Sequence, residues 1–213
     1  MLKAKVRTLN TIAELKARSR ENAVLVRSDG VGLRVVTLDD GGDAALIATC
    51  SRWRAAAAEG FPNRFEVTCE GTQRWLSEQV LKADDRILLL VLDCNDRPVG
   101  HLGLMHIGNE PGRAVVDGVI RGEATPEQPG LMTVAMGMLI TWTFEYLELT
   151  ALDLYVLCDN IKALRLYAAT GFGPTALIPL GRRDIEERTD WVPTEHPQIA
   201  DRFFLKMERR PSA

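Results

Sequence analysis

Two long apolar segments dominate the pattern of hydrophobic and polar positions, and each predicts a different element. Residues 87–92 are continuously apolar between charged neighbours, which favours a central strand buried on both faces of a sheet. Residues 131–147 are apolar nearly all round, which is typical of a helix buried against a sheet. A membrane-spanning helix is excluded there by the length of the segment and by Glu145 and Glu148. The pattern therefore predicts a globular domain with both helices and strands.

Shorter periodic segments fill in the order of elements. Apolar runs bounded by turn residues predict further strands at residues 33–38, 98–107, 114–120, 151–157 and 202–207. Helical spacing predicts helices from the turn at residues 39–43 to about residue 59, at residues 71–83 and at residues 160–170. Gly118 lies inside its strand, where a glycine often marks a bulge or the close approach of a ligand. The charged, proline-bearing segment 185–198 is expected to be a loop.

The first 32 residues are interpreted as an extension. They contain a candidate helix at residues 11–20 and a candidate strand at residues 23–27, followed by a glycine-containing break at residues 29–32. A chain of 213 residues is long enough for one domain with extensions. We therefore expect an N-terminal extension at residues 1–32 and a main domain at residues 33–213. The extension is too short for a confident separate core, so it is expected to pack on the main domain or on a second subunit.

Composition and charge narrow the classes of function. The hydrophobic fraction of 46% is ordinary for a globular chain, and a net charge of −3 gives no indication of general nucleic-acid binding. The four cysteines, at positions 50, 69, 94 and 158, form no Cys-x-x-Cys pair, and the three histidines show no metal-ligand spacing with them. The N-terminus lacks the apolar core of a signal peptide. We therefore expect a reduced, cytoplasmic protein with no metal and with neither nucleic acid nor membrane as a partner.

The most informative motif is Asn-x-x-Ala-x-x-Leu-Tyr-x-x-x-Gly-Phe at residues 160–172. On a helix, Asn160, Ala163 and Tyr167 share one face because they are three and four residues apart. This face follows a predicted strand, so it suits an extended, amide-containing ligand whose reactive end lies near the phenol. The alternative is an ordinary amphipathic helix with Asn160 as N-cap and Gly171 as the residue that ends it. The spacing alone does not separate the two interpretations.

This motif resembles the fourth helix of the GNAT superfamily of N-acetyltransferases, and the resemblance covers about residues 32–209 in the order of the elements. It implies that Asn160 and Ala163 lie against the pantetheine arm of acetyl-CoA, the co-substrate, and that Tyr167 gives a proton to the departing CoA thiolate. The implied fold is α/β (α+β): a central mixed, mostly antiparallel twisted sheet of about six to seven strands, flanked by helices and splayed between its fourth and fifth strands. The implied activity is acetyl transfer to a primary amine.

The same resemblance implies the rest of the CoA site. The pantetheine fills the gap between residues 114–120 and 151–157 and pairs with backbone groups at Val119 and Ile120, much as an added strand would. The N–H near Val119 can polarise the thioester carbonyl. The diphosphate lies at the start of the next helix, where free N–H groups attract anions. The residues expected there are Gln128, Gly130, Leu131, Met132 and Thr133, with Arg121 as a nearby cation.

This helix start departs from the family pattern Arg/Gln-x-x-Gly-x-Gly/Ala. It has the single glycine Gly130, and Met132 stands where a small residue is usual. Either the loop takes another path or CoA binding is altered, and for that reason a non-catalytic acyl-CoA-binding module is an alternative to an enzyme. Pro129 and Gly130 are also explained as ordinary helix-start residues, and Arg121 equally as a surface residue.

A group that removes a proton from the acceptor is also needed, because a primary amine is mostly protonated at neutral pH. Asp117 lies on the strand beside the expected thioester and is the favoured catalytic base. Glu123 and His106 are the other candidates. Each of the three carboxylate or imidazole groups is equally explained as a structural or solvent-facing residue.

The acceptor is expected to be a small-molecule amine framed by arginine and aromatic side chains. These are Arg52, Trp53, Arg54, Arg64 and Phe65 in one region and Arg182, Arg183, Asp184 and Trp191 in another. Such side chains suit a phosphate and a planar base, which points to a nucleotide-linked amino sugar. Residues 71–76 and 100–104 resemble family members that acetylate amino sugars and also members that acetylate ribosomal-protein N-termini, so protein N-terminal acetylation is an alternative. A homodimer is a further expectation.

Overall fold

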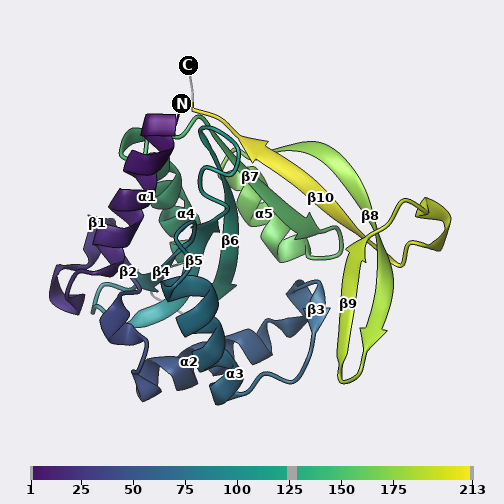
Figure 1. The fold of residues 1–213 in the computed structure, drawn as a ribbon, viewed down its shortest axis with the longest axis horizontal. Helices are drawn as coiled ribbons and strands as arrows, with labels where there is room; N and C mark the ends of the chain where they lie inside the picture. The colour runs from purple at the N-terminus through teal and green to yellow at the C-terminus, as the bar shows by residue number, and fades with distance from the viewer. Residues whose placement is uncertain (1, 124–128, 212–213) are drawn as a thin grey trace.

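A twisted sheet runs through the whole molecule and carries helices on both faces (Figure 1). The structure is a computed structural model that describes residues 2–123 and 129–211. Within these residues the sheet has ten strands, in the order β1-β2-β4-β5-β6-β7-β10-β8-β9-β3. They are β1 (Val24–Ser28), β2 (Val31–Val35), β3 (Asn63–Arg64), β4 (Ile87–Leu92), β5 (Pro98–Met105), β6 (Arg113–Arg121), β7 (Ala151–Leu157), β8 (Gly173–Ile185), β9 (Arg188–Pro193) and β10 (Arg202–Arg209).

The pairing of the strands confirms the expected fold class. Neighbouring strands are antiparallel except β6 and β7, which are parallel. One face of the sheet carries α1 (Leu2–Lys16), α4 (Leu131–Glu145) and α5 (Ile161–Ala169), and the other carries α2 (Ala44–Ala56) and α3 (Cys69–Arg74), which a π-helical segment (Trp75–Leu81) continues. The fold is therefore the mixed α/β arrangement of a mostly antiparallel sheet flanked by helices.

The apolar run of β4 divides between two hydrophobic cores. Leu89 and Val91 pack with α1, α4 and α5, whereas Leu88, Leu90 and Leu92 pack with α2 and α3. Successive side chains of a strand point to opposite faces, so a strand covered by helices on both sides must be apolar at every position. All residues of β4 are buried, which confirms the prediction of a central strand buried on both faces. None of the described helices is long and apolar enough to cross a membrane.

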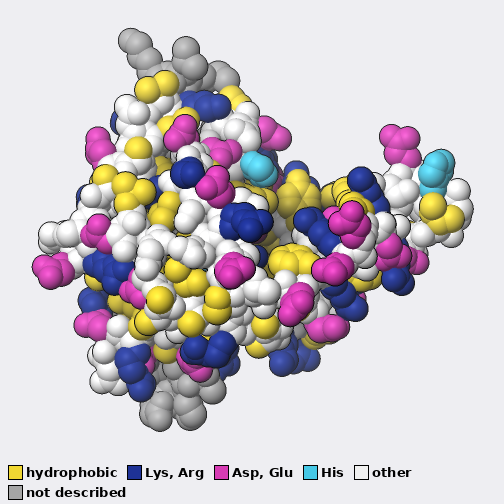
Figure 2. All heavy atoms as spheres, turned by 60° about the horizontal axis from the view of Figure 1, so that its bottom comes forward, with side chains coloured by type: hydrophobic (Ala, Val, Ile, Leu, Met, Phe, Trp, Pro, Cys, Tyr) yellow, Lys and Arg dark blue, Asp and Glu magenta, His cyan; other side chains and the backbone are white. Residues whose placement is uncertain are grey.

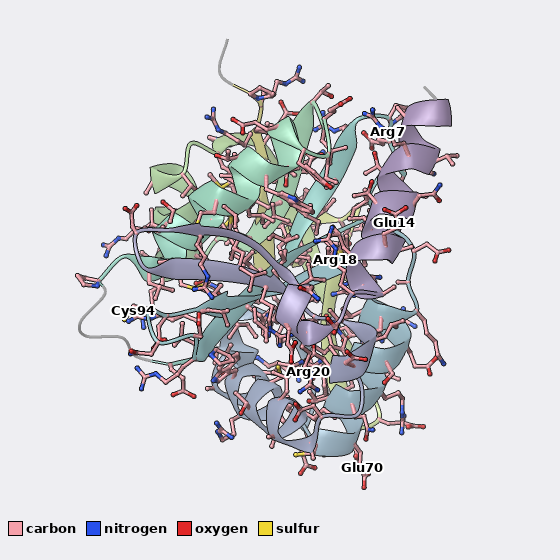
Figure 3. The ribbon with its side chains drawn as sticks, turned by 90° about the vertical axis from the view of Figure 1, so that its left-hand side faces the viewer. Arg7, Glu14, Arg18, Arg20, Glu70 and Cys94 are labelled. Atoms are coloured by element: carbon pink, nitrogen blue, oxygen red, sulfur yellow. The ribbon has the colours of Figure 1, made fainter. Side chains whose placement is uncertain are left out.

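The N-terminal residues contribute to the same core and sheet as the rest of the chain. α1 is longer than the helix expected at residues 11–20, and its Ile12 and Leu15 are buried in the core that α4 also lines. β1 pairs with β2 at one edge of the sheet. Arg20, which follows α1 and is labelled in Figure 3, forms an ion pair of 2.9 Å with the buried Asp40. Apolar burial, strand pairing and an ion pair thus all join this segment to the main body.

The C-terminal arm differs from the expectation. The expected loop at residues 185–198 is wrong, because β8 and β9 form a long hairpin that stands out from the main body, with β3 paired to β9 on the side nearer α3 (Figure 1). β8 contains Pro174 and Pro179, and most of its residues are exposed, so neither an apolar run nor a clean alternation marks it as a strand. With this hairpin, β1 and the short β3, the sheet has ten strands in the described residues instead of six to seven.

The parallel strands β6 and β7 pair only at their beginnings. The paired residues are 113–115 in β6 and 151–153 in β7, and both strands continue for several residues beyond this short ladder. The expected splay of the sheet is therefore confirmed. At the closed end, the Arg113 guanidinium of β6 lies 2.7 Å from the Asp153 carboxylate of β7 and 2.6 Å from the Glu208 carboxylate of β10. Three strands are joined by ion pairs where the gap begins.

At the open end, β6 contains the bulge that Gly118 predicts. His101 of β5 is opposite Ile120, and Gly103 is opposite Asp117, so two residues of β6 lie opposite one residue of β5. Gly118 has a φ of 60°, a conformation that glycine adopts without the steric cost that a Cβ would bring. The bulge lies at the same level as the unpaired part of β7, and it turns the backbone of β6 out of the regular ladder.

Candidate active site

A cleft of about 290 Å³ opens where β6 and β7 diverge. Its walls come from the unpaired parts of both strands, from α5 and from the loop that follows α2. Seen from the side of α2 and α3, the molecular surface is hollowed between the main body and the C-terminal arm (Figure 2). Among the described residues that line the cleft, Asp117 is the one with a charged side chain, and most of the others are apolar.

The face of α5 predicted from its spacing lines this cleft. Asn160 is the N-cap of α5, and its side-chain oxygen accepts a hydrogen bond from the Ala163 N–H at 3.2 Å. Asn160, Ala163 and Tyr167 all lie on the cleft wall. The capping interpretation and the ligand interpretation of Asn160 are thus compatible, because the cap uses the oxygen and leaves the amide N–H₂ on the cleft side. An added Cβ at Gly60 would lie 2.8 Å from that amide nitrogen, so a larger residue there would displace the amide.

Tyr167 is held in a largely apolar environment at the base of α5. Its side chain is buried, with an edge contact of 6.0 Å between its ring centroid and that of Phe172. Burial raises the pKa of Tyr167 well above its usual value of 10, and the charge of Asp117 raises it further. The phenol therefore keeps its proton at every physiological pH and can serve as a hydrogen-bond or proton donor.

Of the β6 residues expected to contact acetyl-CoA, some line the cleft and others point away from it. Gly118 and Val119 line the cleft. The side chain of Ile120 instead packs in the core beneath α2 and α3, so only its backbone is available to a ligand. Arg121 is exposed, and its Nε lies 3.5 Å from the carbonyl oxygen of Glu123.

α4 begins after a glycine. Gly130 is the N-cap with a φ of 80°, and a Cβ added there would meet none of the described residues within 4 Å. Leu131 and Met132 are buried in the core, whereas Thr133 is exposed. The side chain of Met132 is thus accommodated in the core, and the first N–H groups of α4 are of the kind that attracts anions. Gln128 lies outside the described residues.

The three candidate bases lie in different places. Asp117 lines the cleft together with Tyr167, and its carboxylate forms an ion pair with Arg86. Glu123 instead accepts a hydrogen bond from the Trp53 indole N–H at 2.8 Å. His106 is exposed and faces a neighbouring cavity, with its Nδ1 3.6 Å from a carboxylate oxygen of Asp85. The structure brings Asp117, and neither of the other two, to the wall that carries Tyr167.

Most of the arginine and aromatic side chains expected to hold a nucleotide are already paired, often with residues outside the expected set such as Trp75, Arg188 and Arg202. The Trp75 ring has Arg54 at 4.4 Å and Arg86 at 5.8 Å from its centroid. Trp191 has Arg64 and Arg202 each at 5.0 Å. These rings already have cations on them and are poorly placed to stack a planar base. The remaining members of the set are placed as follows: Trp53 is buried, Arg52 lies 3.7 Å from Glu123, Arg188 covers Phe65, Arg182 pairs with Asp184, and Arg183 lies opposite Asp190 in the hairpin.

A second cavity, of about 360 Å³, adjoins the cleft and was not expected from the sequence. Both spaces share Met105, Val115 and Tyr155 in their walls. The second cavity carries side chains of both charges, which are His106, Glu110, Arg113, Asp153 and Lys206. No local signal marks them, since they come from strands and loops far apart in the sequence. The described residues contain no cluster of histidine, cysteine or carboxylate side chains placed to hold a metal ion.

Comparison with known proteins agrees with this geometry. Residues 31–173 match the family model described as acetyltransferase (GNAT) domain. Among solved structures, a probable GNAT-family acetyltransferase from Chromobacterium violaceum superposes with a TM-score of 0.64 at 18% identity, covering 91% of this chain and 88% of that one. Spermidine N-acetyltransferase from Vibrio cholerae, in complex with CoA and spermine, gives 0.63 at 16% identity, with 86% and 96% covered.

A third similar structure is the ribosomal-protein-S5-alanine acetyltransferase from Vibrio fischeri, with a TM-score of 0.60, 16% identity, and 87% and 95% of the two chains covered. At these identities the likeness is one of fold. No curated protein sequence gives a significant match.

Proposed function

The chain belongs to the GNAT family of acetyltransferases, which use acetyl-CoA, and from that premise we propose how its cleft carries out the transfer and which amine it accepts. The observation that carries the proposal is the open end of the β6–β7 pair. Two unpaired strand edges there face each other across a cleft that also presents Asn160 and Tyr167. An extended ligand with amide groups fills such a gap as an added strand fills a sheet edge.

The described residues fit acetyl-CoA at three points. The amide N–H₂ of Asn160 faces the cleft beside Ala163, whose small side chain leaves room for the pantetheine arm. The N–H groups at the start of α4 suit the diphosphate, because a helix N-terminus attracts anions and no described residue lies within 4 Å of a Cβ placed on Gly130. The bulge at Gly118 brings the backbone of β6 to the cleft wall, where the Val119 N–H can donate to the thioester carbonyl.

Acetyl-CoA supplies the activated acetyl group as a thioester. In the transfer, the C–S bond breaks as the amine nitrogen forms the C–N bond, and one proton passes from nitrogen to sulfur. Asp117 attracts the ammonium form of the acceptor and takes up its first proton, which passes to solvent and leaves the free amine; the second proton lost from nitrogen balances the one that the sulfur gains. Tyr167, protonated throughout the physiological range, donates to the sulfur as negative charge develops there. Orientation by the cleft walls supplies much of the remaining acceleration.

For the acceptor, the adjoining cavity favours a hydroxyl-rich amine. Its cationic and anionic groups, among them Lys206 and Asp153, give donors and acceptors side by side, as the hydroxyl groups of a sugar require. Tyr155 is 42% exposed at the junction and offers a ring face. A polyamine carries only positive charge and gains less from a site that includes Lys206 and Arg113. An amino sugar is therefore the first acceptor to test, and its nucleotide-linked form remains part of this proposal.

The test is thiol release from acetyl-CoA with a panel of amines. The panel contains free and nucleotide-linked amino sugars, spermidine and peptides with free N-termini. Turnover on amino sugars supports the proposal, whereas turnover on peptides alone assigns protein N-terminal acetylation and turnover on spermidine alone assigns a polyamine. Tight binding of acetyl-CoA by calorimetry, with no thiol released on any amine, contradicts an enzymatic role and favours a binding module.

A further inference from the structure

His101 of β5 is buried beside the bulge of β6. Its side chain is buried, and its ring centroid is 6.1 Å from both the Trp53 and the Trp75 rings. Burial is the main cause that lowers the pKa of His101 to about 4, and the positive charges of Arg54 and Arg86 lower it a little further. The negative charge of Asp117 acts in the opposite direction. The imidazole is therefore neutral at physiological pH and carries one N–H.

The position of that N–H follows from the single polar contact of the ring. Nδ1 of His101 lies 2.5 Å from the carbonyl oxygen of Gly118. A carbonyl oxygen can only accept, so the proton is on Nδ1 and the neutral ring has none on Nε2. Nε2 is buried and has no hydrogen-bond partner among the described residues. A buried polar atom left unpaired costs free energy, and a leucine at this position would avoid that cost. The contact with Gly118 is the one polar interaction that the imidazole provides.

The Gly118 carbonyl belongs to the bulge of β6. In a trans peptide the N–H of the next residue points opposite to the carbonyl. Because the Gly118 carbonyl points to the imidazole of His101, the Val119 N–H of the same peptide points to the side opposite that imidazole, and Val119 lines the cleft. The φ of 60° at Gly118 permits this turn, but a glycine leaves several orientations of the peptide open.

We propose that His101 is a positioning residue, whose Nδ1–H holds the Gly118–Val119 peptide so that the Val119 N–H faces the thioester carbonyl. The proposal rests on the proposed function, since it assigns the backbone donor of that reaction. The imidazole touches neither acetyl-CoA nor the amine, and it acts through the carbonyl of Gly118. A donor held in place stabilises the charge that develops in the transition state far more strongly than one that must reorient. This gain offsets the free-energy cost of burying the unpaired Nε2 of His101.

The test compares two amides at position 101. The side-chain N–H₂ of asparagine can occupy the place of Nδ1–H, whereas that of glutamine reaches the place of Nε2–H. His101→Asn is expected to retain kcat within about threefold, and His101→Gln and His101→Leu to lose about tenfold to 100-fold, as expected for a misaligned donor. KM for acetyl-CoA changes little in all three. His196→Gln, at an exposed histidine of the arm, is the matched control. Equal losses in the asparagine and glutamine variants, or no loss in either, overturn the proposal.

A second readout is independent of turnover. The backbone amide resonance of Val119 is followed by NMR as acetyl-CoA or CoA is added. Acetyl-CoA, which has the carbonyl, is expected to shift the Val119 amide proton downfield in wild type and in His101→Asn but not in His101→Gln, and CoA to leave it near its free position. Equal shifts with both ligands, or the same shift in the glutamine variant, contradict the proposal even if binding is tight. An enzyme that shows the shift but acetylates no amine contradicts the proposed function instead.

Discussion

The two ends of the β6–β7 pair are built by opposite means. At the closed end, backbone pairing and the ion pairs of Arg113 with Asp153 and Glu208 hold three strands together. At the open end, pairing stops, Gly118 makes a bulge, and a cleft takes the place of a ladder. Strand edges left unpaired have to be satisfied by something else, and here a ligand is the natural partner. The ion pairs and backbone pairing at the closed end hold β6, β7 and β10 together at the point from which the open end diverges.

The largest expected effect belongs to the open end. Tyr167→Phe removes the hydroxyl that donates to the leaving sulfur, so kcat is expected to fall about 100-fold or more, with acetyl-CoA affinity changed by less than about twofold. Thiol-release kinetics and calorimetry measure the two quantities. Tyr146→Phe removes the same hydroxyl from a tyrosine that is 58% exposed, and it is expected to have no effect. Normal turnover by Tyr167→Phe would show that Tyr167 is not the proton donor.

The next effect belongs to the closed end and appears in stability. Arg113→Met leaves Asp153 and Glu208 without their shared partner in partly buried positions, and it is expected to lower the free energy of unfolding by about 2–3 kcal/mol. Arg182→Met breaks an exposed pair with Asp184 and is expected to cost less than about 0.5 kcal/mol. Urea unfolding of both variants checks this, and equal losses would show that the closed end has no special role.

Gly118→Ala tests whether the bulge serves the cleft. A Cβ at a φ of 60° is strained by about 1–2 kcal/mol, and it would also lie 3.3 Å from Leu88 Cδ1. The expected result is a loss of about tenfold in kcat together with a lower Tm. Gly137→Ala, in α4 with open space around it, is expected to keep kcat and to raise Tm slightly. Full activity in Gly118→Ala would show that transfer does not depend on this backbone conformation.

The smallest effect is the acid dependence of the closed end. Hydrogen bonds from Arg210 and Arg113 lower the pKa of Glu208 to about 2, from 4.5. A lowered folded-state pKa means stability that is fully present above about pH 4.5 and is lost as the pH falls towards 2. Wild type is expected to exceed Glu208→Gln by about 1–2 kcal/mol at pH 6, with the difference vanishing near pH 2. A constant difference over this range would mean that the glutamate charge contributes nothing.

The sequence predicted the elements whose formation depends on the order of apolar and polar residues within a single segment. β4 is readable because helices on both faces require an unbroken apolar run, and α5 because its ligand face follows helical spacing. The bulge at Gly118 was readable from a glycine inside a strand. The central strand, the face of α5 that lines the cleft and the bulge at Gly118 were therefore predicted correctly from local sequence patterns.

Long-range contacts were not readable in the same way. The partners Arg113 and Glu208 are 95 residues apart, and Arg86 and Asp117 are 31 apart, so no spacing rule connects them. The hairpin of β8 and β9 was missed because prolines and exposed positions hide its alternation. The role of His101 could not be predicted from the sequence, because it depends on a contact with the carbonyl of Gly118 on the neighbouring strand.

The most direct test of the central claim is a crystal structure of the protein with acetyl-CoA. We predict the pantetheine arm between the unpaired parts of β6 and β7, with the thioester carbonyl at the Val119 N–H, the sulfur at the Tyr167 hydroxyl and the diphosphate at the start of α4. A ligand bound elsewhere, or a cleft closed by its own side chains under saturating acetyl-CoA, would contradict the account.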